Sequence, residues 1–262
     1  MACLDIGVVG AAGRMGQSLV REIVEKDGVR LVAASECDAH AALGQDAGAL
    51  AGLGTLGVKI TDDSEQVFEI ADSVLEFSSP QATVIHAGLA ASRGVSHVIG
   101  TTGLSVGEEA ELRVASGQTA IFWAPNMSIG VNVLIALAER AAAALSDDFD
   151  IEILEMHHKH KVDAPSGTAL ALGNAVAKGR GVKLEEVSQR ARDGITGERR
   201  RGDIGYAVLR GGDVVGSHSV ILAGENERLE LAHQATSRQI FAAGAVRAAI
   251  WLRKQPSGLY GM

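Results

Sequence analysis

The chain has 262 residues and a mass of 27.1 kDa, and 47% of its residues are hydrophobic. This composition is typical of a globular protein that can bury a sizeable core without disulfides. A net charge of −8 and an isoelectric point near 5.5 argue against a broad surface for nucleic acid or anionic membranes. The cysteines, Cys3 and Cys37, lack metal-ligand spacing and suit a reducing compartment. The first residues carry no basic leader, and the most apolar stretch, 131–138, is shorter than the roughly 18 residues of a membrane span. We therefore expect a cytoplasmic protein that binds small molecules.

The first 36 residues predict a strand, a turn, a helix and a second strand. Leu4–Val9 is a short apolar run, Arg14–Lys26 has helical spacing of apolar residues, and Val29–Ala34 is a second apolar run. The alternation continues, with strands expected at Val58–Ile60, Val74–Phe77, Val95–Ile99 and Ala120–Trp123 and helices at Ala82–Arg93 and Gly107–Ser116. This order predicts an α/β domain with a doubly wound parallel sheet of the Rossmann type over residues 1–127.

A second, α+β domain is expected over residues 128–238. After a helix at about Ile129–Leu145 and a strand at Ile151–His157, the remaining strand candidates are separated by turn residues, as in a mixed and mostly antiparallel sheet. These candidates are Ile204–Arg210, Asp213–Ala223 and Arg228–Ala235. A final helix within 239–262, at Ile240–Lys254, is expected to return to the first domain.

The turn after the first strand favours a dinucleotide. It reads Gly10-Ala11-Ala12-Gly13-Arg14-Met15-Gly16, and glycines in this position allow a pyrophosphate to approach backbone N–H groups and the positive end of a helix. Glu36 lies twenty residues beyond Gly16, at the end of the second strand, where an acid can accept hydrogen bonds from an adenosine ribose.

Three later segments follow expected strands and so lie at the ligand-binding edge of a parallel sheet. They are Phe77-Ser78-Ser79-Pro80, Gly100-Thr101-Thr102-Gly103 and Ala124-Pro125-Asn126-Met127. The second supplies hydroxyls and backbone amides suited to a nicotinamide ribose and carboxamide, although each segment also suits a plain turn.

The segment from Glu155 to Thr168 is the most unusual in the chain, because it gathers five basic or protonatable side chains at 157–161. If the strand continues, His157, Lys159 and Lys161 point one way and His158 and His160 the other. The lysine charges disfavour a metal, so an anionic ligand is the better interpretation, with a solvated strand end as the alternative. Pro165-Ser166-Gly167-Thr168 then predicts a helix start, whose N–H groups suit a carboxylate or serve only in capping.

These residues together resemble the dihydrodipicolinate reductase family over nearly the whole chain. The most specific match is "EMHHKHKVDAPSGTA" from Glu155, supported by "GAAGRMG", "GTTG" and "APNMS". The resemblance implies reduction of 4-hydroxy-tetrahydrodipicolinate, a small dicarboxylate, to tetrahydrodipicolinate by NADH or NADPH in lysine and diaminopimelate biosynthesis. It also implies a homotetramer assembled through the sheet of the second domain.

By motif position, the resemblance makes His157 the acid, Lys161 its partner, and His158, Gly167 and Thr168 the contacts to substrate. It assigns the cofactor to Gly10, Ala11, Ala12, Gly13, Arg14, Met15, Glu36, Gly100, Thr101, Thr102, Ala124, Pro125, Asn126 and Met127.

One departure from the family concerns the cofactor. Members that use NADPH well often carry arginine after the ribose acid and in the loop before Pro80, where this chain has Cys37 and Ser79. We therefore expect NADH to be used at least as well as NADPH. Two alternatives remain open on the sequence, a dinucleotide sensor without catalysis and a metal-dependent hydrolase built on the three nearby histidines.

Overall fold

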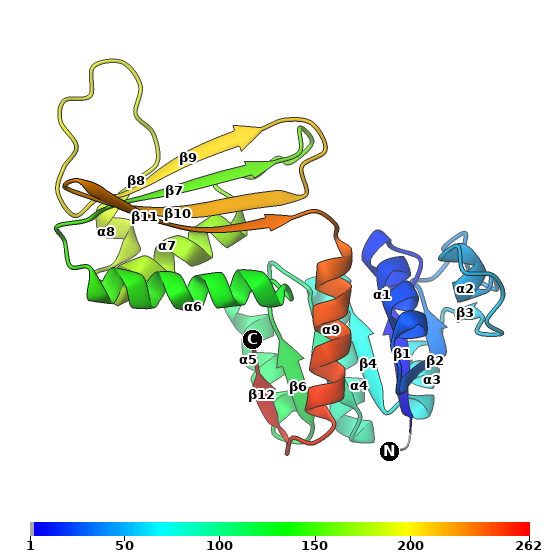
Figure 1. Ribbon diagram of the computed structural model, residues 1–262. Helices are drawn as coiled ribbons and strands as arrows, with labels where there is room; N and C mark the ends of the chain where they lie inside the picture. Colours follow the sequence, from blue (N-terminus) through cyan, green and yellow to red (C-terminus); the bar gives the residue numbers. More distant parts are fainter. Residues whose placement is uncertain (1–2) are drawn as a thin grey trace. The chain divides into compact units, whose positions relative to one another are not determined.

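The computed structural model describes residues 3–262, which form two compact units. One unit contains the residues up to 128 together with 238–262, and the other contains 129–237 (Figure 1). The last stretch of the chain is therefore part of the same unit as its beginning.

The first unit is built on a seven-stranded sheet in the order β12-β6-β5-β4-β1-β2-β3. Its strands are β1 (Leu4–Val9), β2 (Val29–Ser35), β3 (Ile60–Thr61), β4 (Ser73–Glu76), β5 (Ser96–Ile99), β6 (Ala120–Trp123) and β12 (Gly258–Tyr260). Each described strand pairing in this sheet is parallel, which confirms the predicted Rossmann-type arrangement. The third strand lies two residues later than expected, and β12 was not predicted.

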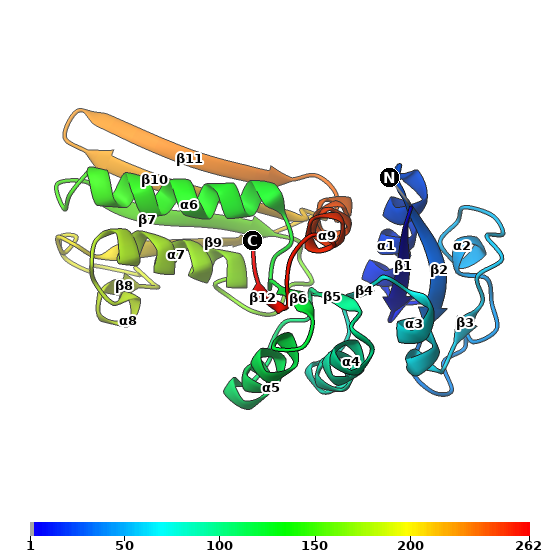
Figure 2. The same cartoon turned by 90° about the horizontal axis from the view of Figure 1, so that it is seen from below.

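Helices cover both faces of this sheet (Figure 2). They are α1 (Arg14–Glu25), α2 (Ala47–Leu50), α3 (Ser64–Ile70), α4 (Pro80–Arg93), α5 (Val106–Ser116) and α9 (Gln239–Leu252). On one face, Leu19 of α1 and Val246 of α9 pack with Ile6 and Val8 of β1. The other face carries α3, α4 and α5, with Phe68 of α3 buried there.

The second unit has a five-stranded sheet in the order β11-β10-β7-β9-β8. The strands are β7 (Asp150–His157), β8 (Ser188–Gln189), β9 (Ile204–Arg210), β10 (Gly216–Gly224) and β11 (Glu227–Ala235), and the helices are α6 (Ile129–Ala144), α7 (Gly167–Gly179) and α8 (Leu184–Val187). Figures 1 and 2 show α6 and α7 along one face of this sheet. Leu134 of α6 and Leu172 of α7 pack there on Ile151, Ile153 and Val220.

The second sheet is mixed, and its pairing differs in one respect from the expected run of antiparallel neighbours. β10 pairs antiparallel with β7 and β11, but β9 pairs parallel with β7. The strand β7 lies between β9 and β10, so the turn at Gly211-Gly212 connects strands that are not neighbours. Turn residues predict that the chain reverses direction, but they do not determine whether another strand lies between the two strands that the turn connects.

Candidate functional site

The glycine turn of the first unit has the geometry of a phosphate cradle. Gly10 has φ +72°, a conformation that favours glycine. A Cβ atom on Gly16 would lie 2.1 Å from the carbonyl oxygen of Gly10, so only glycine allows this close approach of helix α1 to the turn. Gly13 and Arg14 are exposed at the start of α1, where N–H groups and the helix dipole favour an anion. The turn therefore fits the pyrophosphate of a dinucleotide.

Glu36 lies at the end of β2, beside this turn. One of its carboxylate oxygens, Oε1, accepts a hydrogen bond of 3.1 Å from the N–H of Ala12, and the other, Oε2, accepts one of 3.0 Å from the N–H of Cys37. These bonds fix the carboxylate against the glycine turn, and each oxygen keeps a lone pair for a hydroxyl.

A cavity of about 650 Å³ adjoins Glu36 within the first unit. Its lining includes the glycine turn, the loop after β4, three acidic side chains and one histidine; these are Gly10, Gly13, Ser78, Ser79, Glu36, Asp38, Asp62 and His86. A volume of this size suits part of a dinucleotide. The residues thus fit the cofactor that the sequence predicts.

The predicted cofactor residues in the loops after β5 and β6 differ in their exposure. Thr101 is buried, and its hydroxyl oxygen accepts hydrogen bonds from the N–H of Ser78 (3.1 Å) and the hydroxyl of Thr83 (2.9 Å).

Thr102 is exposed, as is Pro125. Gly100, Ala124 and Met127 are buried, and Asn126 accepts a bond from the N–H of Ser128. Thr101 and Met127 therefore shape the loops from within, and the exposed positions are the ones open to a ligand.

In the second unit, the feature with most chemical consequence is the pair Glu155 and His157. Both lie on β7 and point to the same face, because side chains two apart on a strand share a face. The Nδ1 atom of His157 lies 2.6 Å from Oε2 of Glu155. A carboxylate at Nδ1 accepts its N–H, which leaves Nε2 as the atom that can exchange a proton with a ligand.

Glu155 is fully buried and well supplied with donors. The guanidinium of Arg210 bonds both of its oxygens, at 2.8 and 3.0 Å, and the N–H of Ser166 donates at 3.0 Å. Burial by itself raises the pKa of Glu155, but Arg210, His157 and the Ser166 amide outweigh it and hold the pKa below its usual range. Glu155 is therefore ionised at neutral pH and orients His157. No local pattern in the sequence predicts this role for Glu155 or Arg210.

The basic segment does not continue the strand. β7 ends at His157, and residues 158–160 turn away, so the alternation expected for His157, Lys159 and Lys161 does not extend that far. Lys161 is half-buried and its Nζ atom lies 2.8 Å from Oδ1 of Asp163, while Lys159 and His160 are exposed. The backbone turns just after the strand, where the N–H of Lys161 donates to the carbonyl of His158 at 3.1 Å.

Ser166 connects this segment to helix α7. Its hydroxyl oxygen accepts from the N–H of Ala169, as an N-cap does, and lies 3.1 Å from Nε2 of His218 on β10. Gly167 and Thr168 form the first turn of α7, where N–H groups precede the helical hydrogen bonds. The ring of His218 lies edge-on to that of His157, with centroids 5.0 Å apart. The buried residue Ser166 thus contacts both the start of α7, where the carboxylate site is predicted, and Glu155, which orients the candidate acid His157.

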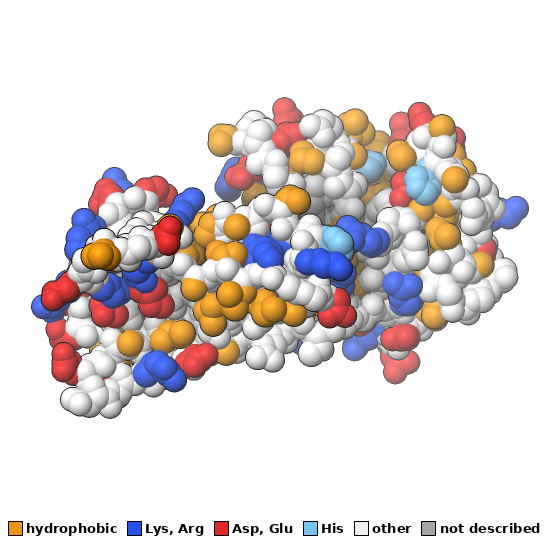
Figure 3. All heavy atoms as spheres, turned by 90° about the horizontal axis from the view of Figure 1, so that it is seen from above, with side chains coloured by type: hydrophobic (Ala, Val, Ile, Leu, Met, Phe, Trp, Pro, Cys, Tyr) orange, Lys and Arg blue, Asp and Glu red, His pale blue; other side chains and the backbone are white. Residues whose placement is uncertain are grey.

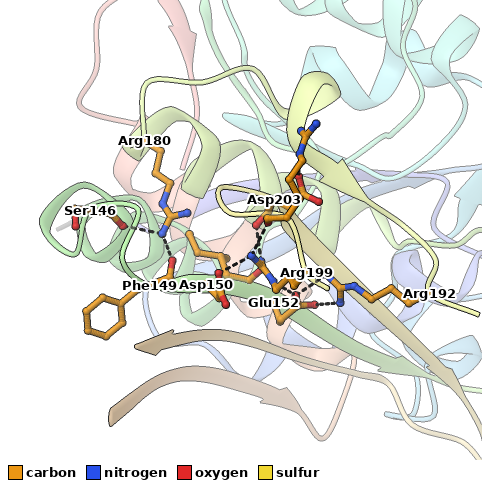
Figure 4. Close-up of polar contacts among 10 residues, drawn as sticks. Ser146, Phe149, Asp150, Glu152, Arg180, Arg192, Arg199 and Asp203 are labelled. Carbon is orange, nitrogen blue, oxygen red and sulfur yellow. Dashed lines mark hydrogen bonds and ion pairs between the residues drawn. The ribbon is translucent and has the colours of Figure 1, made fainter. Parts of the chain in front are cut away.

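A second cluster of charges lies at the other end of β7 and is internally neutralised (Figure 4). Arg199 contacts Glu152 and Asp150, and Arg192 bonds both oxygens of Glu152, at 2.8 and 2.9 Å. A Cβ on Gly205, opposite Glu152 in the sheet, would lie 1.9 Å from that carboxylate. These arginines anchor the loop before β9, and their charges are met by acids.

Across residues 3–262, no group of three or more His, Cys, Asp and Glu side chains is arranged to hold a metal ion. No helix in the described part of the chain has the length and apolar composition needed to cross a membrane.

Comparison with known proteins agrees with this geometry. Residues 4–127 match the family model of the dihydrodipicolinate reductase N-terminus, and residues 130–262 match that of its C-terminus. The 4-hydroxy-tetrahydrodipicolinate reductase of Sinorhizobium fredii is 58% identical over 99% of this chain and 96% of its own length. That of Brucella abortus is 56% identical over 99% of this chain and 97% of its own.

The fold also has a solved counterpart. A dipicolinate-bound dihydrodipicolinate reductase from Paenisporosarcina sp. TG-14 matches with a TM-score of 0.79 and 23% identity, over 99% of this chain and 97% of that one. On the two family matches and the high identity of the relatives, the chain belongs to the dihydrodipicolinate reductase family.

Proposed function

We infer that this chain is an NAD(P)H-dependent oxidoreductase that reduces 4-hydroxy-tetrahydrodipicolinate to tetrahydrodipicolinate in lysine and diaminopimelate biosynthesis. The observation that carries the inference is the near-complete alignment with relatives of that name, at 58% and 56% identity. The site residues then take roles from their own geometry and chemistry.

We propose that the first unit holds the cofactor at the glycine turn, Glu36 and the loops after β5 and β6. When bound, NAD(P)H supplies the hydride. The N–H of Gly13 donates to the carbonyl of Gly10 within the turn, at 3.2 Å, so the N–H groups at the start of α1 from Arg14 onward meet the pyrophosphate charge. The carboxylate of Glu36 accepts from the adenosine ribose while it keeps its bonds to Ala12 and Cys37.

We propose that the second unit binds the substrate and delivers a proton. Hydride addition leaves negative charge on the substrate ring, so a proton must reach the ring from a side chain positioned to donate one. His157 serves as this donor through Nε2, because Glu155 occupies Nδ1. Gly167 and Thr168 hold one carboxylate of the substrate at the start of α7, and His158 provides a further contact.

Lys161 completes the proposed site as an electrostatic partner. Its Nζ atom pairs with Asp163, whose carboxylate is exposed and whose pKa Lys161 holds below the usual range. Because Asp163 is exposed, water competes for its carboxylate and the ion pair is weak, so a substrate carboxylate can replace Asp163 at little cost. Lys161 then stabilises the negative charge that develops on the ring.

The decisive experiment follows the absorbance of NADH with purified protein and freshly generated 4-hydroxy-tetrahydrodipicolinate. We expect oxidation of NADH that depends on both protein and substrate. Tight binding of NADH without turnover would instead identify a dinucleotide sensor and overturn the proposed activity.

We further propose that NADH is used at least as well as NADPH. The cavity beside Glu36 is also lined by Asp38 and Asp62, and among its lining residues none is lysine or arginine. Three carboxylates would repel the extra phosphate of NADPH, and neither Cys37 nor Ser79 can neutralise it. We expect kcat/KM for NADH to equal or exceed that for NADPH in the same buffer. A strong preference for NADPH would show that another basic residue, such as Arg14, reaches the phosphate.

We also propose a homotetramer assembled through the second sheet, and a cytoplasmic location shared with other enzymes of amino-acid biosynthesis. In this sheet α6 and α7 cover the face that carries Ile151 and Ile153. Register places the apolar side chains of Leu154, Leu209 and Ile221 on the other face. Figure 3 shows hydrophobic side chains gathered between charged groups on the upper surface of the molecule. An apolar sheet face of this kind favours burial against another subunit.

A further inference from the structure

Glu76, at the end of β4, is a fully buried carboxylate that the proposed reaction does not use. Its Oε1 atom lies 2.8 Å from Nδ1 of His86 and also accepts a bond from the hydroxyl of Ser78. Its Oε2 atom lies 2.8 Å from Nε2 of His97 on β5. Burial alone raises the pKa of Glu76, but the two histidines outweigh it and lower the pKa to about 2. A buried charge is costly unless it is paired, and three side chains are held around this one. The places of these partners in the fold indicate what the charge of Glu76 does.

Two of the three partners of Glu76 lie on the wall of the cavity beside Glu36. Ser78 and His86 both line that cavity, whereas Glu76 does not. The same carboxylate oxygen holds both side chains, although Ser78 belongs to the loop after β4 and His86 to helix α4. One buried charge therefore sets the relative positions of two wall residues.

The hydrogen bonds around Ser78 also reach the loop that follows β5. The N–H of Ser78 donates to the hydroxyl oxygen of Thr101, which also accepts from Thr83. Glu76 thus fixes the Ser78 side chain, and the Ser78 backbone in turn fixes the loop that follows β5. Hydrogen bonds to an ionised acceptor are stronger than neutral ones and hold their donors in a narrower range of positions.

We propose that Glu76 is a positioning residue of the nucleotide pocket, which acts through Ser78 and His86 to preorganise the wall that the cofactor contacts. This inference rests on the proposed function, because it takes the cavity beside Glu36 as the cofactor site. Preorganised walls bind more tightly because less conformational entropy is lost on binding. Removing the charge of Glu76 should therefore weaken NADH binding and leave substrate binding unchanged.

The test compares Glu76→Gln, Ser78→Ala and the double variant in the full-length protein. NADH dissociation constants come from fluorescence titration, and steady-state rates give kcat and both KM values. We expect Glu76→Gln to raise the dissociation constant and KM for NADH roughly tenfold, and Ser78→Ala to raise them by roughly threefold, a part of the loss of a charge-assisted hydrogen bond. Substrate KM, and kcat at saturating NADH, should stay near the wild-type values.

The double variant tests the route. If Glu76 acts through Ser78, the double variant should bind NADH no more weakly than Glu76→Gln, because the effects of coupled residues do not add. If the factors by which the two substitutions raise the NADH dissociation constant multiply in the double variant, the two residues act independently and the proposed route through Ser78 is wrong. Glu69→Gln is the matched control, since Glu69 is an exposed carboxylate of the same unit that pairs with Arg93 and does not line the cavity.

The remaining outcomes are also decisive. A wild-type protein that does not bind NADH refutes the proposed function itself. A wild-type protein that binds NADH, together with a Glu76→Gln variant that binds it equally well, refutes only the inference about Glu76. If Glu76→Gln does not fold, Ser78→Ala decides: weaker NADH binding at an unchanged melting temperature supports the proposal, and unchanged binding overturns it.

Discussion

His157 depends for its proposed role on Glu155, two positions earlier on the same strand. A histidine free to rotate could present either nitrogen, but the 2.6 Å contact with Glu155 leaves Nε2 for the ligand. Arg210 and Ser166 keep Glu155 ionised and in place. The reactivity of one side chain is thus set by a group of buried neighbours.

We predict that His157→Gln lowers kcat by roughly 10²–10⁴-fold, the usual range for a lost general acid, with little change in NADH affinity. Lys161→Ala should lower kcat and also raise KM for the substrate, because it removes a charge from the bound and reacting states alike. Steady-state kinetics over a range of pH values provide the measurement. Lys159→Gln is the control, since Lys159 is an exposed lysine of the same segment. Near-normal kcat in His157→Gln would move the acid role to another residue, with His158 as the first candidate.

His218 makes a separate prediction about pH. Burial, followed by the nearby charge of His157, lowers the pKa of His218 from 6.5 to about 4. In the unfolded chain this histidine takes up a proton below about pH 6.5, and in the folded protein only near pH 4. The free energy of unfolding therefore has its full value above about pH 6.5 and decreases as the pH falls from about 6.5 to about 4, where only the unfolded chain binds this proton.

We predict that His218→Gln removes this part of the pH dependence. Glutamine can still accept the hydrogen bond from Ser166 but does not titrate. The fall in unfolding free energy between neutral pH and about pH 4 should be smaller in the variant by up to about 3 kcal/mol, at 1.36 kcal/mol per unit of pKa. Thermal or urea unfolding at several pH values measures it, with the exposed His160→Gln as control. An identical pH dependence in wild type and variant would contradict the buried neutral state of His218.

The first turn of α7 combines two functions that a helix N-terminus can serve. Ser166 caps the helix with its side chain and donates its backbone N–H to Glu155, which orients the candidate acid, and Gly167 and Thr168 form the turn that follows. Ser166 is extended, with ψ 154°, and a Cβ on Gly167 would meet no atom within 4 Å. Proline is therefore accommodated at position 167, and it removes one N–H without breaking the helix.

We predict that Gly167→Pro weakens inhibition by a pyridine-dicarboxylate roughly tenfold or more, the loss expected for a hydrogen bond to a charged group. NADH affinity should not change. The matched control is Val106→Pro, at the first position of α5 after an extended Ser105, in a helix without a proposed ligand. Inhibition constants and NADH titrations measure both effects. Equal loss of both ligands in Gly167→Pro would indicate general unfolding rather than a lost carboxylate donor.

The second sheet has one face covered by helices, and its other face carries the apolar side chains of Leu154, Leu209 and Ile221 beside the charged cluster at Glu152. Leu209 of β9 is 48% exposed on that second face, beside Met156 in the register of β7 and β9. Burial of several such side chains between subunits would supply the free energy for assembly.

We predict that Leu209→Asp shifts the protein from a tetramer to smaller species, because an unpaired carboxylate in an apolar interface is strongly unfavourable. Light scattering coupled to size exclusion measures the mass. Val106→Asp, a change at an exposed helix start in the first unit, should leave the mass unchanged. A wild-type monomer, or a Leu209→Asp tetramer of undiminished stability, would refute assembly through this face.

Several features of this protein can be predicted from short-range patterns in its sequence. The glycine turn, the acid twenty residues later, the parallel sheet of the first unit and the unusual segment from Glu155 to Thr168 all follow from local spacing, and the structure contains each of them. Hydrophobic periodicity and turn residues act within a few positions of the chain, so they can be recognised without a fold.

The contacts between polar groups, by contrast, arise from the fold, because they join residues far apart in the chain. Arg210 reaches Glu155 across 55 positions of the chain, and His218 reaches Ser166 across 52. Glu76, His86 and His97 come together from three different elements. The insertion of β7 between β9 and β10, and the pairing of β12 with β6, are likewise long-range. Such contacts depend on how strands are ordered and on which buried charges then need partners, and no local pattern in the chain encodes either.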